Sequence, residues 1–205
     1  ASSSRGGPEA YQAVFVDGLR HLRGIFPDAH LIFTSSSSVY GQVDGSEVTE
    51  ESETQPSTET SRLLLAAEKN AHTSARLSGI YGPGRSYLLK KFLAGEALIE
   101  DDGRRILNQI HRDDAARALL LLAEKKAAGI YNVSDDEPTS QLKTYQGLAK
   151  LLSRPLPPYG DRPAHSKRAR THKKVLNHKL RALGWKARHP SFLSAVPKLL
   201  KNQEE

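Results

Sequence analysis

The stretch Ile32-Phe33-Thr34-Ser35-Ser36-Ser37-Ser38-Val39-Tyr40-Gly41 decides how the rest of this sequence is interpreted. Its apolar start, together with Leu31, lacks polar alternation, which is typical of a strand buried on both faces of a parallel sheet. The run then ends in serines and turns at a glycine. Because the carboxyl ends of such strands face the ligand crevice, these hydroxyls are predicted to face a bound substrate or cofactor. Serines that only cap their own backbone are the alternative interpretation.

Helix and strand signals alternate on both sides of this stretch. Before it, Pro8 begins an amphipathic helix that is expected to continue to Pro27. After an aperiodic acidic loop, helices are expected near residues 63–67, 87–94, 114–126 and 141–152, and strands near 74–78 and 130–133. Asp113 or Asp114 is expected to cap the helix at 114. This alternation predicts an α/β fold, a Rossmann-like doubly wound parallel sheet.

Composition narrows the class of protein. A chain of 205 residues with 38% hydrophobic content can form one α/β domain with a real core. The absence of cysteine excludes a disulfide framework, a thiolate metal site and a cysteine nucleophile in these residues. No apolar run approaches the ~20 residues that a membrane span needs. We therefore expect a soluble, cytoplasmic protein with a small-molecule substrate and no membrane partner. The sequence does not determine the oligomeric state.

The net charge of +7 is unevenly distributed. Residues 44–59 hold six acids and no base, whereas residues 162–188 hold ten bases and no acid. A proline-rich stretch from Pro155 to Pro163 separates the basic region from the rest. We predict a Rossmann-type part over 1–154 and a small, basic, substrate-side lobe over 155–205. That lobe could bind nucleotide phosphates; nucleic acid is less favoured because no aromatic residues are interleaved with the charges.

Five segments resemble one known family in the same order along the chain. They are the Ser-Ser-x-x-Val-Tyr-Gly pattern at Ser35–Gly41, the segment Arg76–Gly84 with its Tyr-Gly-Pro-Gly, and the segments Ile110–Asp114, Ile130–Val133 and Lys179–Trp185. Together they resemble the extended short-chain dehydrogenase/reductases, the family of NAD-dependent epimerases and dehydratases. The resemblance spans most of the chain and implies the same Rossmann-like fold.

The resemblance also implies a cofactor, NAD or NADP, and a set of site residues. Ser36 would assist catalysis by hydrogen-bonding the substrate oxygen, and the loop Tyr81-Gly82-Pro83 would lie beside the nicotinamide. The expected cofactor contacts are Ser2, Ser3, Ser36, Tyr81, Gly82 and Pro83. The expected substrate contacts are Arg85, Arg162 and Arg168; the last two belong to the basic stretch, and no family motif supports them.

Two departures from the family pattern bear on the chemistry. The catalytic Tyr-x-x-x-Lys of the family falls on Thr60 and Leu64, and neither side chain transfers protons near neutral pH. The chain therefore resembles atypical members without this pair. The glycine-rich pyrophosphate turn is also absent. In the family it precedes everything present here, so we expect roughly 80 further residues upstream of Ala1.

His111 lies beside two aspartates and could be a base or a metal ligand. Structural packing is the favoured interpretation, and no metal is expected, because no second histidine or carboxylate stands at helical ligand spacing. The leading hypothesis is an NAD(P)-binding epimerase/dehydratase-like protein acting on a nucleotide sugar or a similar hydroxylated substrate. The alternatives are a non-catalytic dinucleotide-binding or regulatory protein and, less favoured, a basic nucleic-acid-associated protein.

Overall fold

The computed structural model describes residues 6–161 and 171–201, and its centre is a three-stranded parallel sheet. The strands are β1 (Ile32–Ser36), β3 (Thr73–Leu77) and β8 (Gly129–Val133), in the order β1-β3-β8. Ser36 pairs in register with Leu77, and Leu77 with Val133. All three strands therefore end at one edge of the sheet, as the sequence predicts for a Rossmann-like fold.

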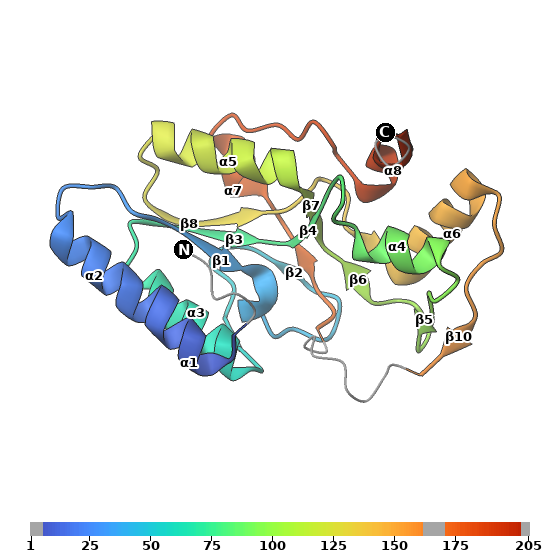
Figure 1. Cartoon of the computed structure of the whole chain (residues 1–205), viewed down its shortest axis with the longest axis horizontal. Coiled ribbons are helices and arrows are strands. Elements are labelled where there is room, and N and C mark those ends of the chain that lie inside the picture. The colour runs from blue at the N-terminus through green and yellow to red at the C-terminus, as the bar shows by residue number, and fades with distance from the viewer. Residues whose placement is uncertain (1–5, 162–170, 202–205) are drawn as a thin grey trace.

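Helices cover both faces of this sheet (Figure 1). One face carries a continuous helical run of α1 (Pro8–Tyr11), the π-helix η1 (Gln12–Asp17) and α2 (Gly18–Ile25), together with α3 (Glu59–Glu68). The opposite face carries α5 (Arg112–Glu124) and α7 (His178–Ala182). Each layer has its own apolar core: Phe33, Val39 and Leu64 on the first face, and Ala75, Leu122 and Trp185 on the second. The predicted doubly wound α/β architecture is confirmed.

A further group of helices and short strands lies beyond the carboxyl edge of the sheet (Figure 1). β4 (Gly79–Tyr81) pairs in parallel with β7 (Gln109–His111). The other elements are α4 (Tyr87–Leu93), β5 (Ile99–Glu100), β6 (Ile106–Leu107), β9 (Thr139–Ser140), α6 (Gln141–Leu152), β10 (Tyr159–Gly160) and α8 (Phe192–Lys201). They enclose a third apolar core that includes Tyr81, Leu89, Phe92, Tyr145 and Phe192.

The C-terminal part of the chain returns to the first part in two places. β11 (Lys174–Val175) pairs in parallel with β2 (Glu47–Val48), which belongs to the loop that follows β1. Helix α7 packs on β8, and Trp185 joins the core beside α5. The division of the chain at residue 155 remains a prediction.

One expectation about local structure, the cap of helix α5 (Arg112–Glu124), changes. Helix α5 begins at Arg112, and its N-cap is His111, whose Nδ1 accepts a hydrogen bond from the Asp113 backbone N–H at 3.2 Å. The prediction that Asp113 or Asp114 caps this helix is therefore wrong, because the Asp114 carboxylate instead accepts from the backbone of Arg188 and His189.

No helix among the described residues combines the length and the apolar character that crossing a membrane requires.

Candidate functional site

A turn rich in hydroxyl groups follows β1 at the carboxyl edge of the sheet. Ser36 is the last residue of β1, and the short 3-10 helix η2 (Ser37–Val39) continues from it. The Ser36 Oγ accepts a hydrogen bond from the Ser38 backbone N–H at 3.1 Å, so the serine does stabilise its own turn. Ser36 remains half-buried, and within the described residues its O–H has no acceptor. The hydroxyl can therefore still donate to a ligand.

A chain of hydroxyl groups connects this turn to the start of α3. The Ser61 Oγ donates to the Ser38 Oγ at 3.1 Å, and the Thr58 Oγ1 donates to the Ser61 Oγ at 2.9 Å. The Thr58 and Thr60 hydroxyls lie 3.2 Å apart. Thr58 is also the N-cap of α3, because its Oγ1 accepts from the Ser61 backbone N–H. Thr58 and Ser61 were not among the residues predicted from the sequence, although a threonine just before a helical segment is a recognisable capping signal.

Thr60 and Leu64 are the residues expected from the sequence to stand where the resembling family has tyrosine and lysine. Thr60 is half-buried and belongs to the hydroxyl chain. Leu64 is only 6% exposed and packs in the same apolar core as Phe33 and Val39. Leu64 therefore offers no titratable group to this part of the site.

A buried polar network connects the strands and the helix that flank the hydroxyl turn. Arg76 forms an ion pair with Glu68 (Nη2 to Oε2, 2.7 Å) and donates through Nη1 to the Tyr40 hydroxyl at 2.8 Å. The Tyr40 hydroxyl donates to Asn132 Oδ1 at 2.9 Å, and the Ser35 Oγ donates to Glu68 Oε1 at 2.6 Å. Burial raises the pKa of Tyr40 despite its contact with Arg76. The network joins β1, β3, β8 and α3, and it fixes the residues on either side of the hydroxyl turn.

The Tyr81 side chain lies in the core. It is 1% exposed, its hydroxyl donates to the Ser191 carbonyl at 3.2 Å, and its ring packs edge-on against His111 and Phe192. Burial raises its pKa well above the ordinary value for tyrosine. The sequence analysis expected this side chain to line the crevice. Because the strand pairing of β4 turns the ring inward, only the backbone of Tyr81 is left to contact a ligand.

The loop after Tyr81 is held by Arg112. A Cβ on Gly82 would lie 2.9 Å from two side-chain carbons of Arg112, and the Pro83 carbonyl accepts from Arg112 Nη1 at 3.1 Å. Gly82 and Arg85 exchange backbone hydrogen bonds, and the Arg85 side chain is exposed. Of the other expected contacts, Ser2, Ser3, Arg162 and Arg168 lie outside the described residues.

The structure brings His189 beside His111 and Asp114. The two imidazole rings stack 3.7 Å apart at 22°, and His189 Nδ1 lies 3.0 Å from Asp114 Oδ2. His189 lies far from His111 in the sequence, so a search at helical ligand spacing does not find it. These three residues nevertheless do not suit a metal ion. In nearly parallel, stacked rings the nitrogen lone pairs lie in parallel planes and do not converge on one point. The Asp114 carboxylate also already accepts two backbone N–H bonds.

The stacked pair predicts a pH-dependent stability. Burial lowers the pKa of His111, His189 lowers it further, and Asp113 and Asp114 oppose the shift. The imidazole of the unfolded chain titrates near 6.5, so below pH 6.5 the unfolded chain takes up a proton that the folded chain does not yet bind. The free energy of unfolding therefore decreases as the pH falls from 6.5 through the folded pKa of His111. We expect His111→Asn, which keeps a capping acceptor, to flatten this acid loss. Melting temperatures between about pH 7.5 and 5 test it; parallel curves for parent and variant would contradict it.

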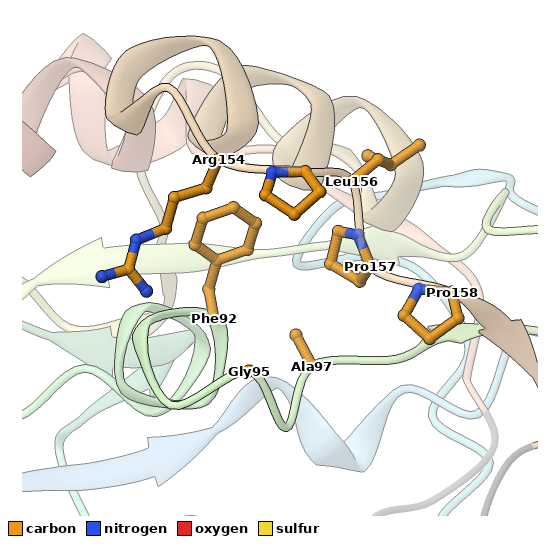
Figure 2. A pocket seen from close by; sticks show the side chains of 8 residues that line it. Phe92, Gly95, Ala97, Arg154, Leu156, Pro157 and Pro158 are labelled. Atoms are coloured by element: carbon orange, nitrogen blue, oxygen red, sulfur yellow. The ribbon is translucent and has the colours of Figure 1, made fainter.

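A separate hollow lies between the end of α4 and the segment after α6 (Figure 2). It encloses about 180 Å³ and is lined by Phe92, Gly95, Ala97, Arg154, Pro155, Leu156, Pro157 and Pro158. Its volume is below the roughly 300 Å³ at which typical ligand pockets begin. Arg154, its single ionisable lining residue, already donates to the Leu93 carbonyl at 2.7 Å. The hydroxyl turn is therefore the stronger candidate site.

The arrangement described so far is matched by a known family. The model of the NAD dependent epimerase/dehydratase family matches residues 16–134, which span the sheet, the hydroxyl turn, the Tyr81 loop and α5. The chain belongs to this family.

Two curated relatives and one solved structure illustrate the similarity. Protein YeeZ of Escherichia coli K12 is 36% identical over 130 residues, covering 60% of this chain and 46% of the relative. The 3-diazoavenalumate denitrifying reductase of Streptomyces is 31% identical over 143 residues, covering 63% and 47%. The chain described here thus spans about half the length of these two relatives. The structure of MoeE5 with UDP-glucuronic acid and NAD has a TM-score of 0.77 at 23% identity, covering 96% of this chain and 73% of that one, which is a likeness of fold.

Proposed function

We propose that this protein is an NAD(P)-dependent, epimerase-like enzyme that acts on a nucleotide sugar or a similar small hydroxylated substrate without the usual Tyr/Lys pair. The observation that carries the proposal is the half-buried Ser36 hydroxyl at the carboxyl edge of a parallel sheet, whose proton has no acceptor among residues 6–161 and 171–201. Family membership and the NAD and UDP-glucuronic acid bound by MoeE5, a protein of the same fold, support it.

The donor set of the turn fits a hydroxylated part of a ligand. Ser36 would donate to a ligand oxygen, while Ser38, Ser61 and Thr58 hold the turn through hydroxyl-to-hydroxyl bonds. The backbone of Gly82 and Pro83 would close the site beside the nicotinamide. When bound, the nicotinamide cofactor supplies hydride transfer. The residues of this chain supply binding and orientation.

The reaction we favour is hydride transfer to a substrate carbonyl, with the proton for the new hydroxyl taken from water. Serine and threonine hydroxyls are poor general acids and bases near neutral pH, and the resemblance aligns Leu64 with the family lysine. Similarity to a protein named as a reductase supports this preference. The buried Leu64 also supports a second candidate, a dinucleotide-binding protein without catalysis. Turnover assays on the complete gene product, with NADH or NADPH and candidate substrates, separate the two.

Replacing Ser36 with alanine is expected to weaken dinucleotide or substrate binding by roughly 3- to 10-fold, since one hydrogen bond contributes about 0.5–1.5 kcal/mol. Melting temperature should change little, because the side chain is outside the apolar cores. Calorimetric titration of the complete gene product with NAD, NADP and UDP-sugars measures the effect. Ser57→Ala, at an exposed position before α3, is the control. If Ser36→Ala binds every ligand like the parent, the hydroxyl only caps its own turn.

A further inference from the structure

The hollow between the end of α4 and the segment after α6 has the size of a site for one aromatic ring (Figure 2). It encloses about 180 Å³ and is partly open to solvent, so a small ligand can enter it. An apolar cavity of roughly 150 Å³ is large enough to bind benzene. A nucleotide is too large for the hollow. None of the lining residues belongs to the hydroxyl turn or to the Tyr81 loop.

The walls of the hollow are apolar and stiff. Phe92 is buried, and its ring stacks on the Tyr145 ring with the centroids 6.1 Å apart at 17°. Three prolines from the segment after α6 form another wall (Figure 2), and the ring of each fixes the backbone φ angle. Because these groups resist collapse into the space, little conformational freedom is lost when a ligand enters.

Apolar surface around the hollow is in contact with water. Leu156 lines the hollow and is 40% exposed, and Leu151 and Tyr159, in the same part of the chain, are exposed as well. Removal of apolar surface from water is favourable, and exposed apolar groups that gather in one place commonly mark interaction sites. A ring that enters the hollow would therefore be stabilised by covering part of this surface.

Arg154 supplies a positive charge at the edge of the hollow. Its Nη1 donates to the Leu93 carbonyl at 2.7 Å, which holds the guanidinium group in place beside the apolar walls (Figure 2). A guanidinium group has five N–H donors. No carboxylate among residues 6–161 and 171–201 forms an ion pair with Arg154. The remaining N–H groups can therefore donate to the carboxylate of a ligand, in the paired geometry that arginine favours.

We propose that this hollow is a binding site for a small aromatic carboxylate. The ring occupies the space between Phe92 and the prolines, and the carboxylate accepts hydrogen bonds from Arg154. An apolar hollow alone would accept any small ring, and an exposed arginine alone would pair with any anion. Because both line one hollow, together they select a ligand that carries a ring and a carboxylate. The site shares no residue with the hydroxyl turn, so it does not depend on the proposed function.

Titration of the complete gene product with benzoate and with benzyl alcohol, followed by NMR, tests the assignment. The two probes share the ring and differ in the carboxylate. We expect the parent to bind benzoate about 10-fold more tightly than benzyl alcohol, because a charged hydrogen bond is stronger than a neutral one. Dissociation constants on the order of millimolar are expected for ligands of this size. A parent that binds benzoate no better than benzyl alcohol, or not at all, overturns the proposal.

Arg154→Gln tests the role of the charge, because glutamine keeps an N–H donor for the Leu93 carbonyl. We expect this variant to bind benzoate about 10-fold more weakly than the parent and benzyl alcohol within about twofold of it. The control is Lys150→Gln, which removes an exposed charge near the end of α6 and should change neither affinity beyond about twofold. Equal weakening of benzoate by both substitutions would mean that the anion is held only by the general positive charge of this surface, and would contradict the assignment.

Filling the hollow gives an independent readout. Ala97 lines the hollow and is buried, so Ala97→Leu should occupy the space of the ring and weaken both probes by about 10-fold or more. A melting curve shows whether this variant is folded; if it is not, Arg154→Gln decides. A folded Ala97→Leu variant that binds both probes like the parent places them elsewhere and overturns the proposal. NAD and NADP affinities should be the same in the parent and Arg154→Gln, so a failure of the parent to bind dinucleotide contradicts the proposed function alone.

Discussion

Replacing Arg76 with methionine is expected to destabilise the protein by about 3–5 kcal/mol, as removal of one partner of a buried ion pair does. The Arg76 and Glu68 side chains are 3% and 7% exposed. Without the guanidinium, the Glu68 carboxylate would keep only its bond from Ser35, and the Tyr40 hydroxyl would lose a donor. Since whole domains are stable by only about 5–15 kcal/mol, much of the protein should be unfolded at 37 °C. Urea denaturation followed by circular dichroism measures the change.

Arg104→Met is the matched control for this prediction. Arg104 also forms an ion pair, with Asp102, but the two side chains are 83% and 53% exposed. Exposed pairs contribute about 0–1 kcal/mol. A similar effect of both substitutions would show that the network beneath the turn contributes no more than a surface contact.

Replacing Gly41 with alanine is expected to cost about 1–3 kcal/mol, as overpacking typically does, and to abolish binding of dinucleotide and UDP-sugars. A Cβ at this position would lie 2.0 Å from the Gln55 carbonyl oxygen and 2.9 Å from the Gln55 Cβ. Because a backbone atom cannot be displaced by a side-chain rotation, the turn after β1 must move away from the segment before α3. Ser38 and Ser61 would then lose their contact. Melting temperature and calorimetric titration on the same sample separate the two effects.

Gly24→Ala provides the control for Gly41→Ala. Gly24 lies in helix α2, and a Cβ there would meet nothing within 4 Å. Alanine is the better helix former by up to about 1 kcal/mol, so this variant should be slightly more stable and should bind ligands normally. If Gly41→Ala behaves like Gly24→Ala, the close approach to Gln55 is not needed for the site.

The order of the main elements was predictable because it depends on long, regular patterns. The apolar run before the serines predicted β1, and helical periodicity predicted α6 at the bounds observed, Gln141–Leu152. Strands β5 and β6 were missed, since two residues are too few to show a periodicity. The π-helix η1 was also missed. It is only six residues long, and so short a segment does not visibly interrupt the roughly helical spacing of the apolar residues.

The candidate site was predictable only where its residues are neighbours in the sequence. The serine run indicated Ser36 because the hydroxyls directly follow their strand. By contrast, Lys173 and His189 are distinguished only by contacts with residues far away in the chain. The Lys173 Nζ donates to the Tyr40 carbonyl at 2.6 Å, and His189 Nδ1 lies 3.0 Å from Asp114 Oδ2. Neither residue differs in the sequence from an ordinary surface lysine or histidine.

The pairing of β11 with β2 has a consequence for biosynthesis. Chains are folded progressively from the N-terminus as they are made, and contacts between distant segments form late because a long loop must close first. The parallel sheet β1-β3-β8 needs residues up to Val133, whereas the loop that leaves Ser36 is braced by Lys173 and β11. A nascent chain can therefore pair the strands of its central sheet before β11 reaches β2, so the loop after Ser36 is completed only once residues 174–175 have been made.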